Sequence, residues 1–274
     1  MAKIPLEDNF NDIIGKALRG HKLDVPRAAQ QAGVTPAQLQ QLLDGQFDEA
    51  ALRRVAPVLQ LGAAQLVASA KKSWYPAEVG PIDGLLCFNT PYEDMTVNSY
   101  LVWDPASRRA AAFDTGADCA TMLAAVRDQR LQVELILLTH THGDHILDLT
   151  RLKKATGAPA HVGRQEQFTE ATPFDPGHAF AVGKLKIETR QTSGHARGGI
   201  TYLVSGLRKP LAIVGDAIFA GSMGGGMIDY AEALRTNRQS ILSLPADTVL
   251  CPGHGPLTTV GEQQTHNPFF TAAA

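Results

Sequence analysis

The chain has 274 residues, 44% of them hydrophobic, and a formal net charge of −2 at pH 7. This length suffices for one large domain or two smaller ones, and the hydrophobic share permits a substantial core. The nearly balanced charge gives no electrostatic reason to expect a nucleic-acid or acidic-membrane partner, so such functions would need evidence of their own.

Residues 1–75 are rich in Ala, Gln and Leu at helical spacing and predict a small all-α N-terminal domain, separate from residues 76–274. Asp24 and Thr35 have the character of N-caps, and a proline stands at the start of the helix that follows each. We interpret residues 71–76 as a linker. The expected helices cover residues 10–18, 25–31, 35–43, 49–59 and 63–69.

Residues 24–61 resemble a helix-turn-helix of the Cro/repressor kind. Helix 25–31, the turn 32–34 and helix 35–43 carry the resemblance, and the second helix would present Gln38, Gln40 and Gln41. Glutamine can read adenine edges, but this helix has no Lys or Arg for the phosphate contacts that supply much of the affinity for DNA. We therefore favour a role in assembly, with a homodimer as the expected state, and keep DNA binding as the less favoured alternative.

Residues 76–274 alternate predicted strands and helices, which indicates the α/β class. We predict helices at 117–129, 146–156 and 230–242, the last being the final helix of the chain. The predicted strands cover residues 85–88, 97–103, 110–113, 133–138, 185–189, 200–204, 211–214 and 248–251.

A cluster of histidines follows the buried strand 133–138, in the segment Thr139-His140-Thr141-His142-Gly143-Asp144-His145. Imidazole and carboxylate are the ligand types that zinc-like metals accept. His140 and His142 would point to the same side of an extended backbone, whereas Asp144 and His145 come where a helix begins and can face a second point. One strand end therefore offers two pairs of ligands, which suits two adjacent metal ions.

Three further candidate ligands come later in the chain: His195, Asp216 and His254. Each follows a glycine just past a predicted strand or turn, a common setting for site residues held by a scaffold. Cys251 precedes His254 by three positions, but we interpret it as a strand residue and not as a ligand. We predict that the glycine-rich stretch 221–226 is a flexible loop at the mouth of the site, since it lacks the Lys-Ser/Thr of a phosphate loop.

In order and spacing, these seven residues resemble the ligands of the metallo-β-lactamase-fold hydrolases, and within them of the glyoxalase II-like branch. The resemblance covers about residues 83–270. It implies an αββα four-layer sandwich for the hydrolase domain, residues 76–274, and two metal sites bridged by Asp216. The implied ligands are His140, His142 and His195 for one metal, and Asp144, His145 and His254 for the other.

The resemblance further implies two divalent metal ions, Zn²⁺ in the first place, with Fe or Mn as alternatives. A bound metal can bring the pKa of water to about 7, so hydrolysis would need no Ser or Cys nucleophile. Asp144 and Asp216 would act in catalysis by offsetting part of the metal charge. Because thiols have a pKa of about 8.5, a thiolate leaves without help. A small-molecule thioester, or an ester, is therefore the expected substrate.

Two other functions remain open at this stage. A persulfide dioxygenase-like enzyme with a single iron would need only three of the seven ligands. A DNA-binding regulator could use the hydrolase domain to sense a ligand. The branch commonly carries an arginine soon after the matching Gly-Ser, and Gly224 to Gly226 occupy that stretch here. Because no candidate ligand precedes His140, the sequence also predicts that a fragment of residues 74–274 keeps its metals and activity.

The cellular setting follows from the cysteines and the apolar runs. Three cysteines, Cys87, Cys119 and Cys251, show no spacing typical of a disulfide framework, which favours reduced thiols. The first residues lack the apolar segment of a secretory signal, and no apolar run approaches the roughly 18 residues of a membrane span. We therefore expect a cytoplasmic protein without a membrane partner.

Overall fold

Five helices open the chain in the computed structural model, which describes residues 3–272. They are α1 (Phe10–Gly20), α2 (Val25–Ala32), α3 (Pro36–Leu43), α4 (Glu49–Val58) and α5 (Ala63–Ala70). The predicted caps form: Asp24 accepts a hydrogen bond from the Arg27 backbone N–H at 2.8 Å, and Gly33 ends α2 with a φ of 64°. All five predicted helices are confirmed, because caps and prolines mark their ends in the sequence.

The helices α2 and α3 offer few side chains that could contact DNA. Gln38 is engaged in the capping box of α3, where its side chain accepts a hydrogen bond from the Thr35 backbone N–H at 2.9 Å. Gln40 and Gln41 are exposed, and α3 contains neither Lys nor Arg. The resemblance to a helix-turn-helix and its use on DNA stay predictions.

The N-terminal helices share a hydrophobic core with the rest of the chain. Met223, Tyr230 and Phe269 lie in the same buried cluster as the apolar faces of α1 to α5. Gly20 lies so close to Tyr230 that a Cβ there would stand 2.3 Å from the ring. The predicted linker, residues 71–76, also packs against the rest of the chain, since Trp74 stacks on His266 with ring centroids 4.9 Å apart. The domain boundary near residue 75 stays a prediction, and the shared core argues against two independent units.

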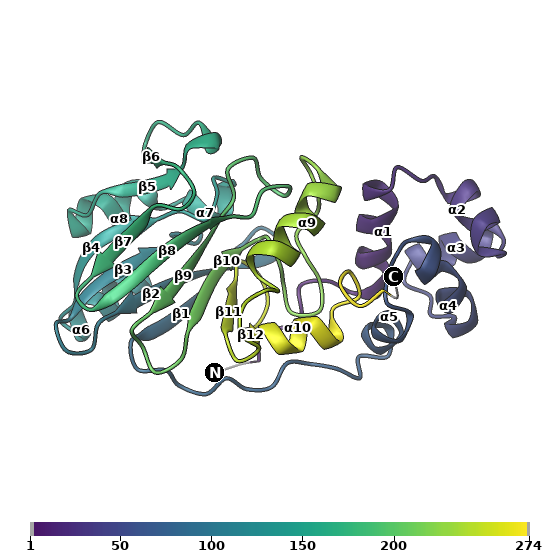
Figure 1. Ribbon diagram of the computed structural model, residues 1–274, viewed down its shortest axis with the longest axis horizontal. Helices are drawn as coiled ribbons and strands as arrows, with labels where there is room; N and C mark the ends of the chain where they lie inside the picture. The colour runs from purple at the N-terminus through teal and green to yellow at the C-terminus, as the bar shows by residue number, and fades with distance from the viewer. Residues whose placement is uncertain (1–2, 273–274) are drawn as a thin grey trace.

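Two six-stranded sheets form the remainder of the chain (Figure 1). Their strands run in the orders β1-β2-β3-β4-β5-β6 and β12-β11-β10-β9-β8-β7. The first sheet holds β1 (Leu85–Tyr92), β2 (Met95–Trp103), β3 (Arg109–Phe113), β4 (Gln132–Leu137), β5 (Ala160–Gly163) and β6 (Thr172–Phe174). The second holds β7 (Ala179–Val182), β8 (Leu185–Gln191), β9 (Ile200–Ser205), β10 (Leu211–Gly215), β11 (Val249–Pro252) and β12 (Thr258–Thr259).

Helices cover the outer face of each sheet, which makes four layers (Figure 1). Phe113 and Tyr202 meet between the sheets with ring centroids 5.4 Å apart. Met122 of α6 (Ala120–Asp128) and Leu152 of α8 (Leu149–Thr156) pack on the far side of the first sheet. Val260 of α10 (Val260–His266) packs on the far side of the second, near the end of α9 (Tyr230–Ser240). The predicted αββα sandwich is confirmed.

Three sequence predictions about elements need correction. The predicted helix 146–156 is two helices, α7 (Gly143–Ile146) and α8, because the chain turns at Asp148. The predicted final helix 230–242 is followed by α10, whose Thr259 and Glu262 form a capping box that was readable in the sequence. The strands β5, β6, β7 and β12 have two to four residues, too few for a visible period of two. No helix within residues 3–272 is both long and apolar enough to cross a membrane.

Candidate metal centre

All seven candidate ligands meet at one edge of the sandwich, in the segments that follow the strands β4, β8, β10 and β11; Asp144 and His145 lie in α7. They form two groups in which the ligand atoms lie within 4.8 Å of one another. Neither group includes Cys251, which is buried in β11 as a core residue, as predicted. The groups are His140, His142, His195 and Asp216, and then Asp144, His145 and His254.

Three imidazoles converge in the first group. The His142 Nδ1 atom lies 3.1 Å from His140 Nε2 and 3.0 Å from His195 Nε2. A carboxylate oxygen of Asp216 stands 3.4 Å from His195 Nε2 and 3.9 Å from His140 Nε2. His140 and His142 thus face a common point, as their alternation along the chain predicts.

Asp216 lies between the two groups. Its Oδ1 atom is 3.2 Å from His145 Nε2, and its Oδ2 atom is 3.3 Å from His254 Nε2. Asp144 Oδ2 is 3.4 Å from His145 Nε2 and 3.3 Å from His254 Nε2, which completes the second group. One carboxylate therefore reaches ligands on both sides, the position that the family resemblance implies for a bridge.

Two buried polar atoms at this centre have no hydrogen-bond partner in the described part of the chain: His145 Nε2 and Asp216 Oδ1. Buried polar groups in native proteins are nearly always paired, so orphaned atoms that face each other call for a missing partner. The atoms are an imidazole nitrogen and a carboxylate oxygen, which divalent cations accept. The residues present therefore fit two divalent metal ions.

Hydrogen bonds behind the imidazoles fix how the rings are turned. His195 Nδ1 donates to the Gly225 carbonyl at 2.9 Å, and His254 Nδ1 donates to the Thr96 carbonyl at 2.7 Å. His145 Nδ1 donates to Asp114 at 2.9 Å. Contacts of this kind hold the proton on Nδ1 and leave Nε2 free to bind a metal.

Asp114 is a functional candidate that the sequence analysis missed. It accepts hydrogen bonds from the Thr139 backbone N–H and hydroxyl, both at 2.7 Å, and from His145. Thr139 Oγ1 in turn lies 3.0 Å from His140 Nδ1, so one buried carboxylate orients ligands of both groups. The available signal was an acidic residue placed directly after the apolar strand β3, with a φ of 54°.

The glycine-rich stretch 221–226 does not form the predicted loop at the mouth. Ser222, Met223 and Gly224 are buried. A Cβ on Gly224 would stand 1.9 Å from the Asp216 carbonyl oxygen and 2.8 Å from His195 Nδ1. Glycine is required here because the backbone packs directly against the metal centre.

The two groups differ in their protonation. Burial, more than the neighbouring imidazoles, lowers the pKa of His140 well below its usual value, and burial also lowers that of His195. Burial has the same tendency at His145 and His254, but the nearby carboxylates, Asp216 above all, outweigh it. They raise the pKa of His145 to about 10 and that of His254 to about 11. His140 and His195 are therefore neutral at pH 7, whereas His145 and His254 carry protons that a metal must displace.

Metal binding is expected to release protons and to tighten as the pH rises. Below a pH of about 10, both His145 and His254 are protonated without a cation, and only neutral imidazole binds a metal. Displacing two protons weakens binding to the second group by up to about 100-fold for each unit by which the pH falls. Chelator competition with Zn²⁺ at several pH values measures this, and an affinity that does not change with pH would contradict it.

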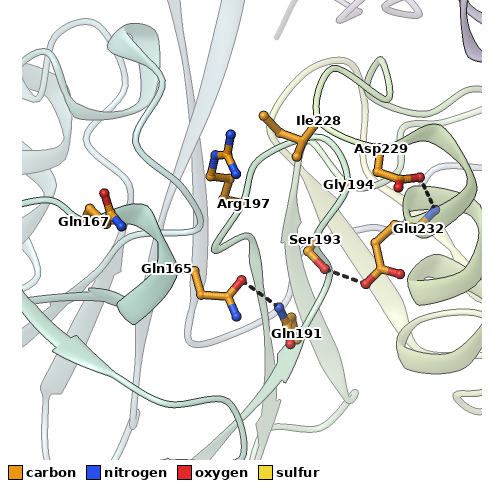
Figure 2. A pocket seen from close by; sticks show the side chains of 9 residues that line it. All are labelled: Gln165, Gln167, Gln191, Ser193, Gly194, Arg197, Ile228, Asp229 and Glu232. Atoms are coloured by element: carbon orange, nitrogen blue, oxygen red, sulfur yellow. Dashed lines mark hydrogen bonds between the residues drawn. The ribbon is translucent and has the colours of Figure 1, made fainter.

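A polar pocket of about 480 Å³ is lined in part by Ser193 and Gly194, the two residues that precede His195. Ser193 donates to Glu232 at 2.9 Å, and Gln191 donates to Gln165 at 3.3 Å (Figure 2). The exposed Arg197 stands between the glutamines and Ile228 (Figure 2). The pocket is lined by Gln165, Gln167, Gln191, Ser193, Gly194, Arg197, Ile228, Asp229 and Glu232.

A family description, the metallo-beta-lactamase superfamily, matches residues 92–254, more than half of the chain. The chain belongs to this superfamily. Its members are generally hydrolytic enzymes whose fold binds divalent metals, and this chain holds two His/Asp groups that could bind such ions. The predicted family is confirmed at this level.

Two relatives illustrate the range of the superfamily around this chain. A beta-lactamase hydrolase-like protein of Xylella fastidiosa is 32% identical over 213 residues, which cover 62% of this chain and 48% of that protein. The chain thus spans about half the length of this curated relative. The hydroxyacylglutathione hydrolase GloC of Haemophilus influenzae is 26% identical over 200 residues, which cover 64% of this chain and 93% of GloC.

Solved structures share the fold. The B3 metallo-beta-lactamase BLEG-1 superposes with a TM-score of 0.57 and 25% identity, over 68% of this chain and 100% of that one. ETHE1 of Myxococcus xanthus has a TM-score of 0.61 and 23% identity, over 69% of this chain and 86% of that one. TTHA1623, in a di-iron-bound form, has a TM-score of 0.55 and 24% identity, over 66% of this chain and 99% of that one. At these identities, the last two likenesses concern the fold alone.

Proposed function

We propose that this protein hydrolyses a small-molecule thioester, using two divalent metal ions held by the seven residues of the metal centre. The observation that carries this proposal is the complete ligand set, with two orphaned buried atoms, beside a polar pocket. The similarity to a hydroxyacylglutathione hydrolase supports the same reaction. We therefore propose the glyoxalase II-like branch for this chain.

Each residue of the centre has a role in this proposal. His140, His142 and His195 would hold one ion, Asp144, His145 and His254 the other, and Asp216 both. When bound, such ions lower the pKa of water to about 7 and polarise a carbonyl group. Asp144 and Asp216 offset part of the positive charge, and Asp114 keeps the proton of His145 on Nδ1, away from the metal.

The polar pocket favours a thioester over an amide. An amine must be protonated to leave, whereas a thiolate leaves at neutral pH without help, because thiols have a pKa of about 8.5. Of the two acids that line the pocket, Glu232 pairs with Arg235 and Ser193, and Asp229 caps α9. Both carboxylates are thus engaged elsewhere. The glutamines and Arg197 offer hydrogen bonds to a polar acyl group such as a hydroxyacyl group.

The second metal group argues against the single-iron dioxygenase reaction. Such an enzyme needs three ligands, yet Asp144, His145 and His254 are assembled here as a second group. Zn²⁺ is the metal that we propose, because imidazole and carboxylate suit it and it needs no redox partner. A di-iron form exists for a structural neighbour, so iron content is measured alongside zinc.

A matched substrate panel tests the proposal. We expect zinc-loaded protein to hydrolyse an S-lactoyl thioester at least about 100-fold faster, in kcat/KM, than the corresponding lactoyl amide, a difference of about 2.7 kcal/mol in barrier. Liberated thiol and lactate are measured in parallel, with the metal-free protein as control. Equal rates for the thioester and the amide, or no thioester hydrolysis with both metals bound, would overturn the proposed function.

A further inference from the structure

A second cavity of about 640 Å³ lies between α1 and the segment 225–231, and we name it the α1 cleft. It borders the metal centre, because Gly225 lines it while its carbonyl accepts the hydrogen bond from His195. It also shares Ile228 and Asp229 with the polar pocket. In Figure 1, α1 faces the loop that leads into α9. Helix α1 and the adjoining Lys22 thus form one wall of a cavity beside the metal centre.

The charged side chains of the α1 cleft are mostly cationic. Lys16 pairs with Asp8 and donates to the Met223 carbonyl at 2.9 Å, so it fastens α1 to the glycine-rich stretch. Arg19 and Lys22 are exposed, and neither forms an ion pair with any residue between 3 and 272. The acid that lines the cleft, Asp229, accepts a hydrogen bond from the Glu232 backbone at 2.9 Å. Two unpaired cations therefore face this cavity.

Apolar side chains complete the wall opposite α1. Met227 is 72% exposed and Ile228 is 49% exposed, although both are large hydrophobic residues. Exposed apolar side chains that line a cavity are typical of a ligand-binding site. Cations near the end of α1 also complement the helix dipole, but that role explains neither the cavity nor the exposed Met227.

We propose that the α1 cleft binds the thiol part of the substrate, and that this part carries a carboxylate at the end of an apolar stem. Arg19 and Lys22 recognise the anionic end, and Met227 and Ile228 contact the stem. This inference rests on the proposed thioester hydrolysis, and it assigns recognition of the anionic end to Arg19 and Lys22, which lie outside the part of the chain that matches the superfamily.

The test compares two thioesters that differ only in the terminal group of the thiol part, a carboxylate in S-lactoyl-6-mercaptohexanoate and a neutral hydroxymethyl group in S-lactoyl-6-mercaptohexanol. The double variant Arg19→Gln/Lys22→Gln is expected to raise KM for the hexanoate at least about fivefold, since each exposed ion pair contributes modestly. Its kcat, and KM for the hexanol, should stay unchanged. The matched control Arg27→Gln/Lys72→Gln removes two exposed cations of the helical part outside the cleft, and should change neither KM.

Direct binding separates this inference from the proposed function. Calorimetry should detect binding of 6-(methylthio)hexanoate, an unreactive analogue, to the wild-type protein with or without metal, and a loss of at least about fivefold in affinity in the double variant. If no thioester is hydrolysed but this binding holds, the reaction is wrong and the cleft is right. Equal effects on the charged and neutral thioesters would overturn the cleft. The cleft would also be overturned if the double variant changed KM according to the charge on the acyl group and not according to the charge on the thiol part.

Discussion

Replacing Asp216 by alanine is expected to strip the protein of metal and to abolish hydrolysis while the fold survives. This carboxylate lies within 3.4 Å of ligand nitrogens in both groups. Although burial opposes its charged form, His254 and His145 hold the pKa of Asp216 well below its usual value, so it is charged at neutral pH. Without it, two cations would sit among imidazoles with Asp144 as the one remaining carboxylate ligand.

We expect Asp216→Ala to reduce kcat/KM by more than about 1,000-fold, or about 4 kcal/mol of barrier. Elemental analysis, thioester hydrolysis and a thermal melt are compared with those of the control Asp118→Ala, which removes a carboxylate that is 60% exposed. Activity within about tenfold of wild type, or about 1.4 kcal/mol, would show that Asp216 does not bridge the metals.

Deleting the N-terminal helices is expected to unfold the remaining chain. The sequence predicts that a fragment of residues 74–274 keeps its metals, because every candidate ligand lies in it. The structure leads us to expect the opposite, since the deletion would expose Met223, Tyr230 and Phe269 to water. Burial of such a side chain contributes roughly 1.5–3 kcal/mol, and three of them amount to a large part of the 5–15 kcal/mol of typical stability.

The N-terminal part is also tied to the stretch that packs on the metal centre. Asp8 accepts hydrogen bonds from Lys16 and from the hydroxyl of Ser222, two residues before Gly224, which packs on Asp216. Solubility and the melting temperature of the fragment test this expectation. A second fragment with Tyr230→Lys and Phe269→Ser controls for simple aggregation, and it should be more soluble while still failing to bind two metals. A fragment of natural sequence that melts like the full chain and holds its metals would restore the sequence prediction.

The elements that the sequence predicts well are those with local signals. Two helix starts are marked in the sequence by Asp24 and Thr35 with the prolines that follow them, and both helices begin there in the structure. The histidine cluster at 140–145 is readable from the sequence because three histidines and one aspartate fall within six residues after a strand. His195, Asp216 and His254 could be grouped with it from glycines and strand ends alone, and the structure brings them together.

The features that the sequence could not predict depend on contacts between distant segments. Asp114 has no motif of its own, and its role follows from its hydrogen bonds with Thr139 and His145, which come after the neighbouring strand β4. The core that joins α1 to Tyr230 links residues about two hundred positions apart, which no period within a helix can reveal. The α1 cleft arises from that same packing, so it too needed the structure.

Metal content tests the central claim most directly. Protein reconstituted with excess Zn²⁺ and freed of loosely bound ions by gel filtration should hold close to two divalent metals per chain, by elemental analysis and native mass spectrometry, because two ligand groups are assembled around Asp216. Protein purified without added metal should be analysed for iron and manganese as well. A single iron per chain would favour the dioxygenase reaction, and protein that binds no transition metal would contradict the account.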